Sequence, residues 1–182
     1  MRKFLYRFIY TYILGWKYKV TVPEFDKCVI CAAPHTTNLD LFIGKLFFGN
    51  AFEGRAHFLM KKEWFFFPLG VFFRAVGGIP VDRKHKTSLT QQMTAVFASR
   101  DKFHLAITPE GTRSANPKWK KGFYYIAYDA KVPIVLIGID YATKTITAGK
   151  YIIPNGDYDS QIAEIKQYYT QFTAKHPERF AI

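Results

Sequence analysis

A histidine and an aspartate stand close together in the stretch PHTTNLD, directly after the apolar run CVICAA. On a regular helix His35 and Asp40, five positions apart, would point about 140° away from each other. They can meet only if His35 lies in a loop and Asp40 in the first turn of a following helix, with the Thr-Thr-Asn sequence between them turning the chain back. The carboxylate would then fix one imidazole nitrogen and leave the other free to take a proton from a hydroxyl group. A loop histidine followed by a helix-capping aspartate is the alternative explanation of this spacing.

Three other stretches carry groups suited to binding an anion. PEGTRS at residues 109–114 combines a glycine, which permits close backbone approach, with Arg113, whose guanidinium can bind a phosphate through two hydrogen bonds. Glu110 is in position to orient Arg113. Arg83 ends the stretch GGIPVDR, and Lys61 lies in FLMKKEW. Each of these charges, taken alone, is equally explained as a solvated surface residue.

The candidate residues are placed by an alternation of strands and helices. Strands are predicted over KCVICAA, RAHFLM, GGIPV, FHLAIT, VPIVLIGID and KTITAGKY. Helices are predicted over LDLFIGKLFFG, SLTQQMTAVFASR, KKGFYYIAYDA and the C-terminal DSQIAEIKQYYTQFTAKHP. This order predicts a single α/β domain over residues 23–182, built around a mixed, mostly parallel sheet flanked by helices.

Residues 1–22 have a different pattern, that of a basic amphipathic helix. Lys3, Arg7 and Thr11 fall on one side, and apolar side chains recur at helical spacing on another. This apolar stripe consists of Phe4, Leu5, Phe8, Ile9, Tyr12, Ile13 and Trp16. Such a helix can lie on a membrane surface or pack on its own domain, and the pattern alone leaves both open. No uncharged apolar run reaches the ~18 residues that a membrane-spanning helix needs, so we expect no simple crossing.

Charge and composition favour an anionic partner. Lys and Arg total 26 against 14 acidic residues, a net charge of +12, and aromatic residues make up 18% of the chain. Nucleic acid, anionic lipid headgroups and phosphorylated substrates would all be attracted. The aromatic residues cluster in apolar runs and are not interleaved with Lys and Arg, which argues against nucleic acid. Cys28 and Cys31 should point to opposite faces of a strand as reduced structural thiols.

Four stretches together resemble the PlsC-like glycerolipid acyltransferase family, which includes 1-acylglycerol-3-phosphate acyltransferases. HTTNLD resembles the family's H-x4-D motif, GGIPVDR its second block, TPEGTRS its F-P-E-G-T-R-S block, and VPIVLIGI its Pro-containing strand. A further stretch, KKEWFFFPLG, also resembles the lysine-containing segment of the family. The resemblance covers about residues 28 to 140. Thr108 replaces the usual Phe, and Pro34 stands where Asn or a second His is frequent, which leaves the identity of the acceptor open.

The resemblance implies a role for each matching residue. His35 would be the general base and Asp40 its partner. An anionic group of the acceptor would be bound by Glu110, Gly111, Thr112, Arg113 and Arg83, assisted by Lys61. It also implies an α/β fold with a membrane-facing N-terminal helix and an acyl-chain groove that opens toward the lipid.

The expected activity is that of an O-acyltransferase in phospholipid biosynthesis. An acyl group would pass from acyl-CoA or acyl-ACP to the hydroxyl of a lysophospholipid, first of all 1-acylglycerol 3-phosphate, without a cofactor or metal. The enzyme would work at the cytoplasmic face of the membrane, as a peripheral or monotopic protein bound to anionic lipid. Two alternatives remain: the same chemistry on an amino-acid lysolipid or glycolipid precursor, and a non-catalytic basic membrane-binding module.

Overall fold

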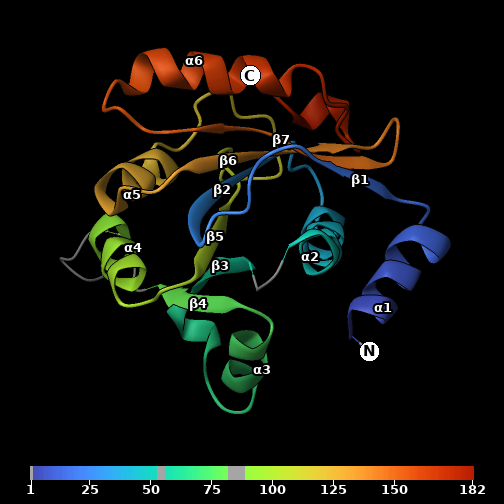
Figure 1. Ribbon diagram of the computed structural model, residues 1–182, viewed down its shortest axis with the longest axis horizontal. Coiled ribbons are helices and arrows are strands. Elements are labelled where there is room, and N and C mark those ends of the chain that lie inside the picture. Colours follow the sequence, from blue (N-terminus) through green and yellow to red (C-terminus); the bar gives the residue numbers. More distant parts are fainter. Residues whose placement is uncertain (1, 53–55, 82–88) are drawn as a thin grey trace.

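The core of the protein is a mixed β-sheet, seen in a computed structural model that describes residues 2–52, 56–81 and 89–182. The described residues form seven strands in the order β1-β7-β6-β2-β5-β3-β4 (Figure 1). Only β6 and β7 pair antiparallel; all other neighbours are parallel. The strands are β1 (Lys17–Val20), β2 (Lys27–Ala33), β3 (Ala56–Lys61), β4 (Gly78–Val81), β5 (Phe103–Ile107), β6 (Ile134–Asp140) and β7 (Thr145–Ile152).

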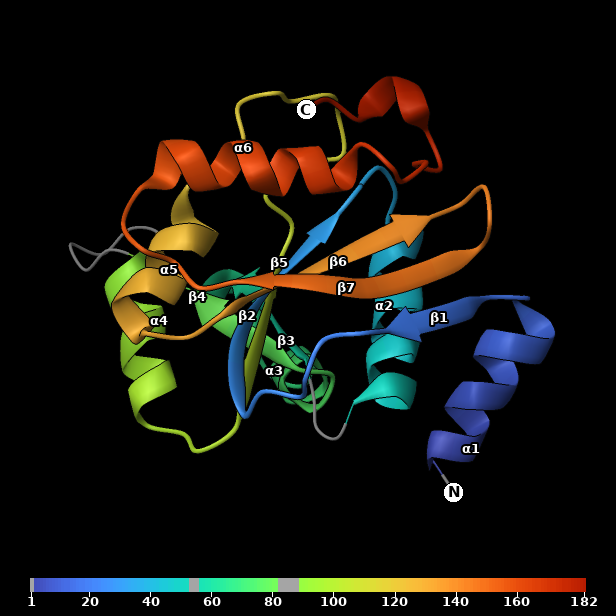
Figure 2. The ribbon, with the colours of Figure 1, turned by 45° about the horizontal axis from the view of Figure 1, so that its top comes forward.

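Helices cover both faces of the sheet. Helix α6 lies above the sheet in Figure 1 and α5 and α4 lie at its left, whereas α1 and α2 lie at the lower right (Figures 1 and 2). The α-helices are α1 (Arg2–Arg7), α2 (Leu39–Ala51), α3 (Leu69–Ala75), α4 (Leu89–Ala98), α5 (Gly122–Ala130) and α6 (Tyr158–Tyr169). Short helical turns are the π-helix η1 (Phe8–Ile13) and the 3-10 helices η2 (Lys62–Trp64) and η3 (Pro177–Arg179).

The central strand β2 contributes to a hydrophobic core on each side. Val29, Cys31 and Ala33 face the core under α4, α5 and α6, while Cys28 and Ile30 face the core under α1 and α2. This explains why residues 28–33, CVICAA, are apolar throughout, since both faces of the strand are buried. The prediction that Cys28 and Cys31 point to opposite faces is confirmed, and both thiols are free and buried. Burial raises the pKa of the Cys28 thiol to about 12.

The N-terminal segment differs in detail from the predicted helix. The helical stretch ends at Ile13, and its last six residues form a π-helix. Tyr10, which was not in the predicted apolar stripe, is fully buried, whereas Phe4 and Tyr12 are about three-quarters exposed. The wider π-turn changes the rotation per residue, so a stripe drawn at ordinary α-helical spacing fails there. Strand β1, which was not predicted, follows and extends the sheet beside β7.

The remaining elements follow the predicted order. The other predicted strands and helices are found close to their expected bounds, except that α6 ends at Tyr169, well before the predicted end of the C-terminal helix. None of the helices in the described ranges is long and apolar enough to cross a membrane.

Candidate active site

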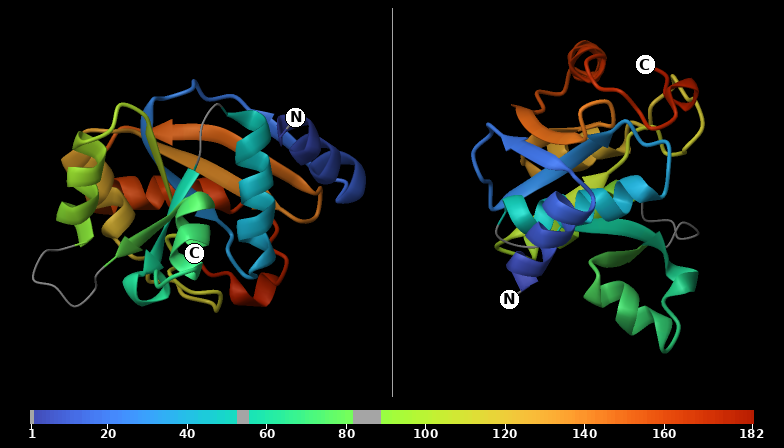
Figure 3. Two further views of the ribbon diagram at one scale, coloured as in Figure 1. Left: turned by 90° about the horizontal axis from the view of Figure 1, so that it is seen from below. Right: turned by 90° about the vertical axis from the view of Figure 1, so that its right-hand side faces the viewer.

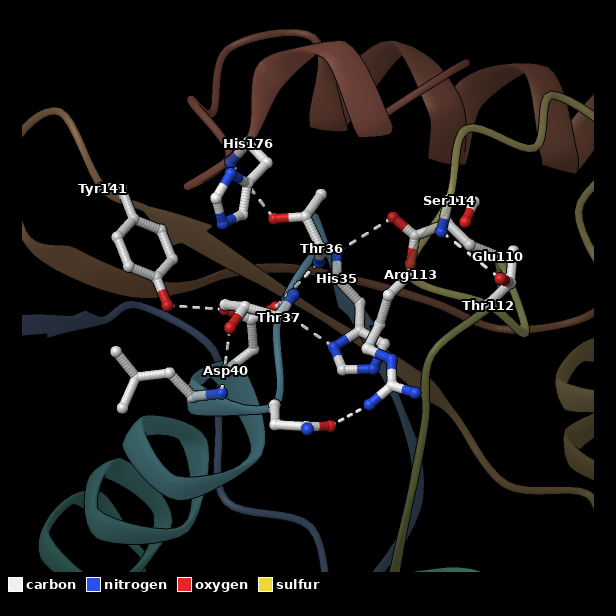
Figure 4. A network of polar contacts seen from close by, with 12 residues as sticks. His35, Thr36, Thr37, Asp40, Glu110, Thr112, Arg113, Ser114, Tyr141 and His176 are labelled. Carbon is white, nitrogen blue, oxygen red and sulfur yellow. Dashed lines mark hydrogen bonds and ion pairs between the residues drawn. The ribbon is translucent and has the colours of Figure 1, made fainter.

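The candidate residues gather where several parallel strands end. Because β2, β5 and β6 run parallel and side by side, their carboxyl ends meet at one edge of the sheet. His35 follows β2, Glu110 follows β5 and Tyr141 follows β6. Figure 4 shows these side chains converging around the first turn of α2.

His35 and Asp40 meet as their spacing predicted. The Nδ1 atom of His35 lies 3.1 Å from Oδ2 of Asp40. His35 lies in the loop, and Asp40 lies in the first turn of α2. The same Oδ2 accepts hydrogen bonds from the backbone N–H groups of Thr36, at 2.8 Å, and Thr37, at 2.9 Å. The carboxylate therefore holds the loop closed as well as facing the imidazole.

The environment of the pair suits a proton acceptor. Burial disfavours the Asp40 carboxylate, but hydrogen bonds from His35, Tyr141 and the two backbone N–H groups outweigh this effect and hold the pKa of Asp40 below its usual value. An ionised Asp40 makes Nδ1 the hydrogen-bond donor of the imidazole. Nε2 then carries the free lone pair. The His35 side chain is 18% exposed, so a substrate hydroxyl can reach the ring.

Tyr141 is a third member of this network that the sequence did not identify. Its hydroxyl donates to Oδ1 of Asp40 at 2.6 Å (Figure 4). Burial and the nearby Asp40 raise the pKa of Tyr141, so the phenol keeps its proton and remains a donor. The available signal was its position in the chain, since Tyr141 directly follows the predicted strand VPIVLIGID.

Glu110 does not orient Arg113, contrary to the expectation from PEGTRS. Its carboxyl group is turned inward and is 2% exposed, and Oε1 accepts a hydrogen bond from the backbone N–H of His35 at 2.9 Å. Oε2 is buried without a hydrogen-bond partner among the described residues. Burial raises the pKa of Glu110 to about 8. Glu110 therefore supports the histidine loop and is shielded from any ligand in the open site.

Arg113 instead reaches the loop after β2. Its guanidinium donates to the side-chain oxygen of Asn38, three residues after His35. Gly111 has a φ of +67°, a left-handed conformation that glycine adopts without strain. Thr112 and Arg113 are exposed on the same turn. The turn thus presents backbone and a cation beside the histidine.

Of the two remaining residues predicted to bind an anion, the structure describes Lys61 only. Lys61 is exposed at the carboxyl end of β3, which lies parallel to β5 and therefore ends at the same edge of the sheet. Arg83 lies outside the described residues.

A second contact ties the histidine loop to the C-terminal region. The hydroxyl oxygen of Thr36 accepts a hydrogen bond from the backbone N–H of His176 at 3.3 Å. The sequence offered no signal for this contact, because the two residues are 140 positions apart.

Comparison with known proteins identifies the family. The family model described as "Acyltransferase" matches residues 18–140, a range that contains the histidine loop, the PEGTRS turn and the strands that carry them. The chain belongs to this acyltransferase family. The predicted family resemblance is therefore confirmed.

Individual relatives extend the comparison. Over 153 residues the acyltransferase chain is 29% identical to the 1-acyl-sn-glycerol-3-phosphate acyltransferase of Saccharomyces cerevisiae, an alignment that covers 79% of this chain and 49% of the yeast protein. The chain thus spans about half the length of that relative. The crystal structure of the 1-acyl-sn-glycerophosphate acyltransferase PlsC from Thermotoga maritima superimposes with a TM-score of 0.65 at 16% identity, covering 93% of this chain and 75% of that one. This match confirms the predicted α/β fold with its mixed, mostly parallel sheet.

Proposed function

We propose that the protein transfers a fatty acyl group from a thioester donor, acyl-CoA or acyl-ACP, to the hydroxyl of a lysophospholipid. The observation that carries this proposal is the His35–Asp40 pair at the open carboxyl edge of the sheet, with Nδ1 facing the carboxylate. An imidazole held in this way is a general base for a substrate hydroxyl. The names of the yeast and Thermotoga relatives support 1-acylglycerol 3-phosphate as the first acceptor to test.

The reaction proceeds by direct attack. Nε2 of His35 removes the proton of the acceptor hydroxyl as its oxygen attacks the thioester carbonyl carbon. The Asp40 carboxylate stabilises the imidazolium that forms. When the tetrahedral intermediate collapses, the carbon–sulfur bond breaks, and the imidazolium returns its proton to the departing thiolate. The products are the acylated lipid and the free thiol.

The exposed turn after β5 binds the anionic group of the acceptor in this proposal. Arg113 supplies the cation, and Gly111 and Thr112 supply backbone groups that an anion can approach closely. Lys61 lies at the same edge of the sheet, and Arg83 completes the set implied by the resemblance. Glu110 has a supporting role, because its buried carboxyl contacts the backbone of the catalytic loop.

The protein works at the cytoplasmic face of the membrane, as a peripheral or monotopic enzyme. The N-terminal helix supports this location, since it exposes Phe4, Leu5, Phe8, Tyr12 and Ile13 to solvent. Apolar side chains at this density are suited to the boundary between headgroups and acyl chains. The net charge of +12 favours anionic lipid and suits either anionic donor.

Three variants test the catalytic assignment. His35→Ala should lower kcat by at least ~100-fold, and Asp40→Asn by ~100-fold or more, because general-base catalysis typically contributes 10²- to 10⁴-fold. Asp157→Asn is the matched control, since Asp157 also accepts a backbone hydrogen bond, from Ser160, at a helix start. It should keep full activity.

The assay follows acyl transfer from acyl-CoA and from acyl-ACP to a panel of lysolipids that includes 1-acylglycerol 3-phosphate, an amino-acid lysolipid and a glycolipid precursor. If the protein acylates only another member of the panel, that lysolipid is the acceptor in place of 1-acylglycerol 3-phosphate. Full activity of His35→Ala would refute the catalytic role of the pair.

A further inference from the structure

A small aromatic lobe stands out from the sheet between β3 and β4. We define it as residues 62–75, which comprise η2, the FFFP connection and α3. Phe67 is 86% exposed and Phe72 is 60% exposed. Other large apolar side chains of the lobe are also exposed: Trp64, Phe66, Leu69 and Val71.

The lobe is folded around contacts of its own. The rings of Phe65 and Phe73 lie 5.9 Å apart, and the Arg74 guanidinium lies 5.3 Å from the Phe65 ring centre. Gly70 packs so closely that a Cβ there would lie 2.5 Å from the Phe65 carbonyl oxygen. Phe65 and Phe73 thus form the interior of the lobe. The exposed apolar side chains of the lobe are therefore held in place by this interior, but no other part of the described protein packs over them.

The lobe and the N-terminal helix project on the same side of the molecule. Both lie on the side of the sheet opposite α6, in the view of Figure 1 and in the view from the right in Figure 3. Helix α1 and η1 also have exposed apolar side chains, Phe4 and Tyr12 most of all. One flat surface can therefore meet both elements at once.

The charges beside the lobe identify the surface that would cover it. Lys61, Lys62 and Arg74 are exposed around the aromatic side chains, with Glu63 as the one acidic residue of the lobe. Exposed aromatic rings bordered by Lys and Arg are the composition of an interfacial membrane contact, in which the rings enter the headgroup region and the cations meet lipid phosphates. We propose that the aromatic lobe is a second membrane-binding element, which inserts Phe67 and its neighbours into an anionic bilayer. This inference deepens the proposed function and rests on its membrane location.

An environment-sensitive fluorophore can test insertion directly. Both native cysteines are buried, so a thiol introduced by Phe67→Cys can be labelled selectively with a nitrobenzoxadiazole maleimide. Vesicles of phosphatidylcholine and phosphatidylglycerol should shift its emission to the blue and increase its intensity several-fold. The matched control is Ile153→Cys, an exposed apolar site after β7, which should give no shift.

A second variant measures how much the lobe contributes to binding. Phe67→Ser should weaken vesicle association roughly tenfold, while Ile153→Ser leaves it unchanged. Acyl transfer to detergent-dispersed lysolipid should remain normal in both variants. A loss of membrane binding can therefore be distinguished from a loss of catalytic activity. No spectral shift at position 67 while the protein still binds vesicles would overturn the proposal. A shift that depends on protein concentration without lipid would also overturn it, and would assign the lobe to contact between two copies of the chain.

A separate observation concerns Tyr141, whose position is fixed from three directions. Its backbone N–H donates to the carbonyl oxygen of Thr173 at 2.9 Å, and Asp140 accepts a hydrogen bond from the Thr173 N–H at 3.0 Å. Its ring meets Trp16 edge-on, with ring centres 5.0 Å apart. Trp16 is itself buried and lies shortly after the N-terminal helix. The hydroxyl that reaches Asp40 is therefore held by β6, the C-terminal segment and the N-terminal segment together.

The two oxygens of Asp40 are held by different groups. Oδ2 accepts from His35 and from the loop backbone, and Oδ1 accepts from Tyr141. With both oxygens bonded, the carboxylate cannot rotate away from the imidazole. We infer that Tyr141 is a positioning residue for the reaction proposed above, and that Trp16 keeps its ring in place.

Removing a single oxygen atom tests this role. Tyr141→Phe keeps the ring contact with Trp16 but loses the hydrogen bond to Asp40. It should lower kcat about tenfold with little change in KM, because a hydrogen bond to a charged group is lost from the pair. The acid side of the pH–rate profile should move to higher pH, since an Asp40 carboxylate without the phenol holds the imidazolium proton more firmly.

The control and a readout independent of turnover complete the test. Tyr10→Phe also removes a buried hydroxyl, which donates to the Lys17 carbonyl oxygen at 2.9 Å, and should leave kcat unchanged. In Tyr141→Phe the proton NMR signal of the His35 Nδ1–H should shift, even if no acceptor has been found. An unchanged kcat together with an unchanged Nδ1–H signal would refute the positioning role.

Discussion

At the scale of single residues, the site contains two buried carboxyl groups, Asp40 and Glu110, of which one is ionised and the other is neutral. Asp40 receives hydrogen bonds on both oxygens, which keeps the pKa of this group below its usual value despite burial. Glu110 receives one from the His35 backbone, its second oxygen has no partner among the described residues, and burial raises its pKa to about 8. Near neutral pH the site therefore holds one carboxylate and one neutral carboxyl group. The negative charge stays beside the imidazole, where the proposed reaction needs it.

The protonation of Glu110 predicts how stability depends on pH. Its pKa is about 8 in the folded protein, against the ordinary value of 4.5 that a glutamate has in an unfolded chain, so the folded state binds more protons between these values. The free energy of unfolding should therefore fall as pH rises from 4.5 to 8, by at most about 1.4 kcal/mol per pH unit. Glu110→Gln mimics the neutral group and should lose this dependence.

Chemical denaturation at several pH values between 5 and 8 measures the effect. The stability of Glu110→Gln relative to the natural protein should increase with pH. Glu164→Gln, at an exposed carboxyl group whose partner is Lys150, is the control and should show a constant difference, because the lysine stays charged over this pH range. A constant difference for Glu110→Gln would show that Glu110 is ionised in the folded protein.

At the scale of elements, the packing of α1 on α2 depends on a glycine. A Cβ at Gly49 would collide with the ring of Tyr6, whereas a Cβ at Gly44 of the same helix would have nothing within 4 Å. Gly49→Ala should thus lower the free energy of unfolding by about 1–3 kcal/mol, the usual cost of overpacking. Gly44→Ala should raise it by up to ~1 kcal/mol, because alanine favours the helix. Thermal unfolding measures both, and equal effects would contradict this packing of α1.

The elements also show what a sequence can and cannot predict. Strands such as β2 and β6 were predictable because they are apolar on both faces, and the His35–Asp40 contact was predictable because loop and helix are adjacent in the chain. The burial of the Glu110 side chain was not predictable, since burial depends on which strands pair. The contact of Tyr141 with Asp40 spans 101 positions and exists only because β6 lies beside β2. In the N-terminal segment, the π-turn broke the periodicity on which the prediction relied.

At the scale of the whole molecule, two apolar projections and the overall charge favour the same membrane orientation. The N-terminal helix and the aromatic lobe both lie on the side of the sheet opposite α6. The net charge of +12 adds a long-range attraction to anionic lipid, which is screened by salt, whereas insertion of apolar side chains is not. Membrane binding should therefore have a component that depends on salt and another that does not.

Vesicle sedimentation at different salt concentrations separates the two components. Raising the salt from about 0.05 M to about 0.5 M should weaken binding to phosphatidylglycerol-containing vesicles by roughly tenfold or more, since each Lys or Arg near the surface contributes ~1 kcal/mol. The weaker binding to pure phosphatidylcholine vesicles should hardly change, because it comes from exposed side chains such as Phe4 and Phe67. Equal salt sensitivity on both kinds of vesicle would mean that the apolar projections do not enter the bilayer. The proposed orientation would then fail even if acyl transfer were observed.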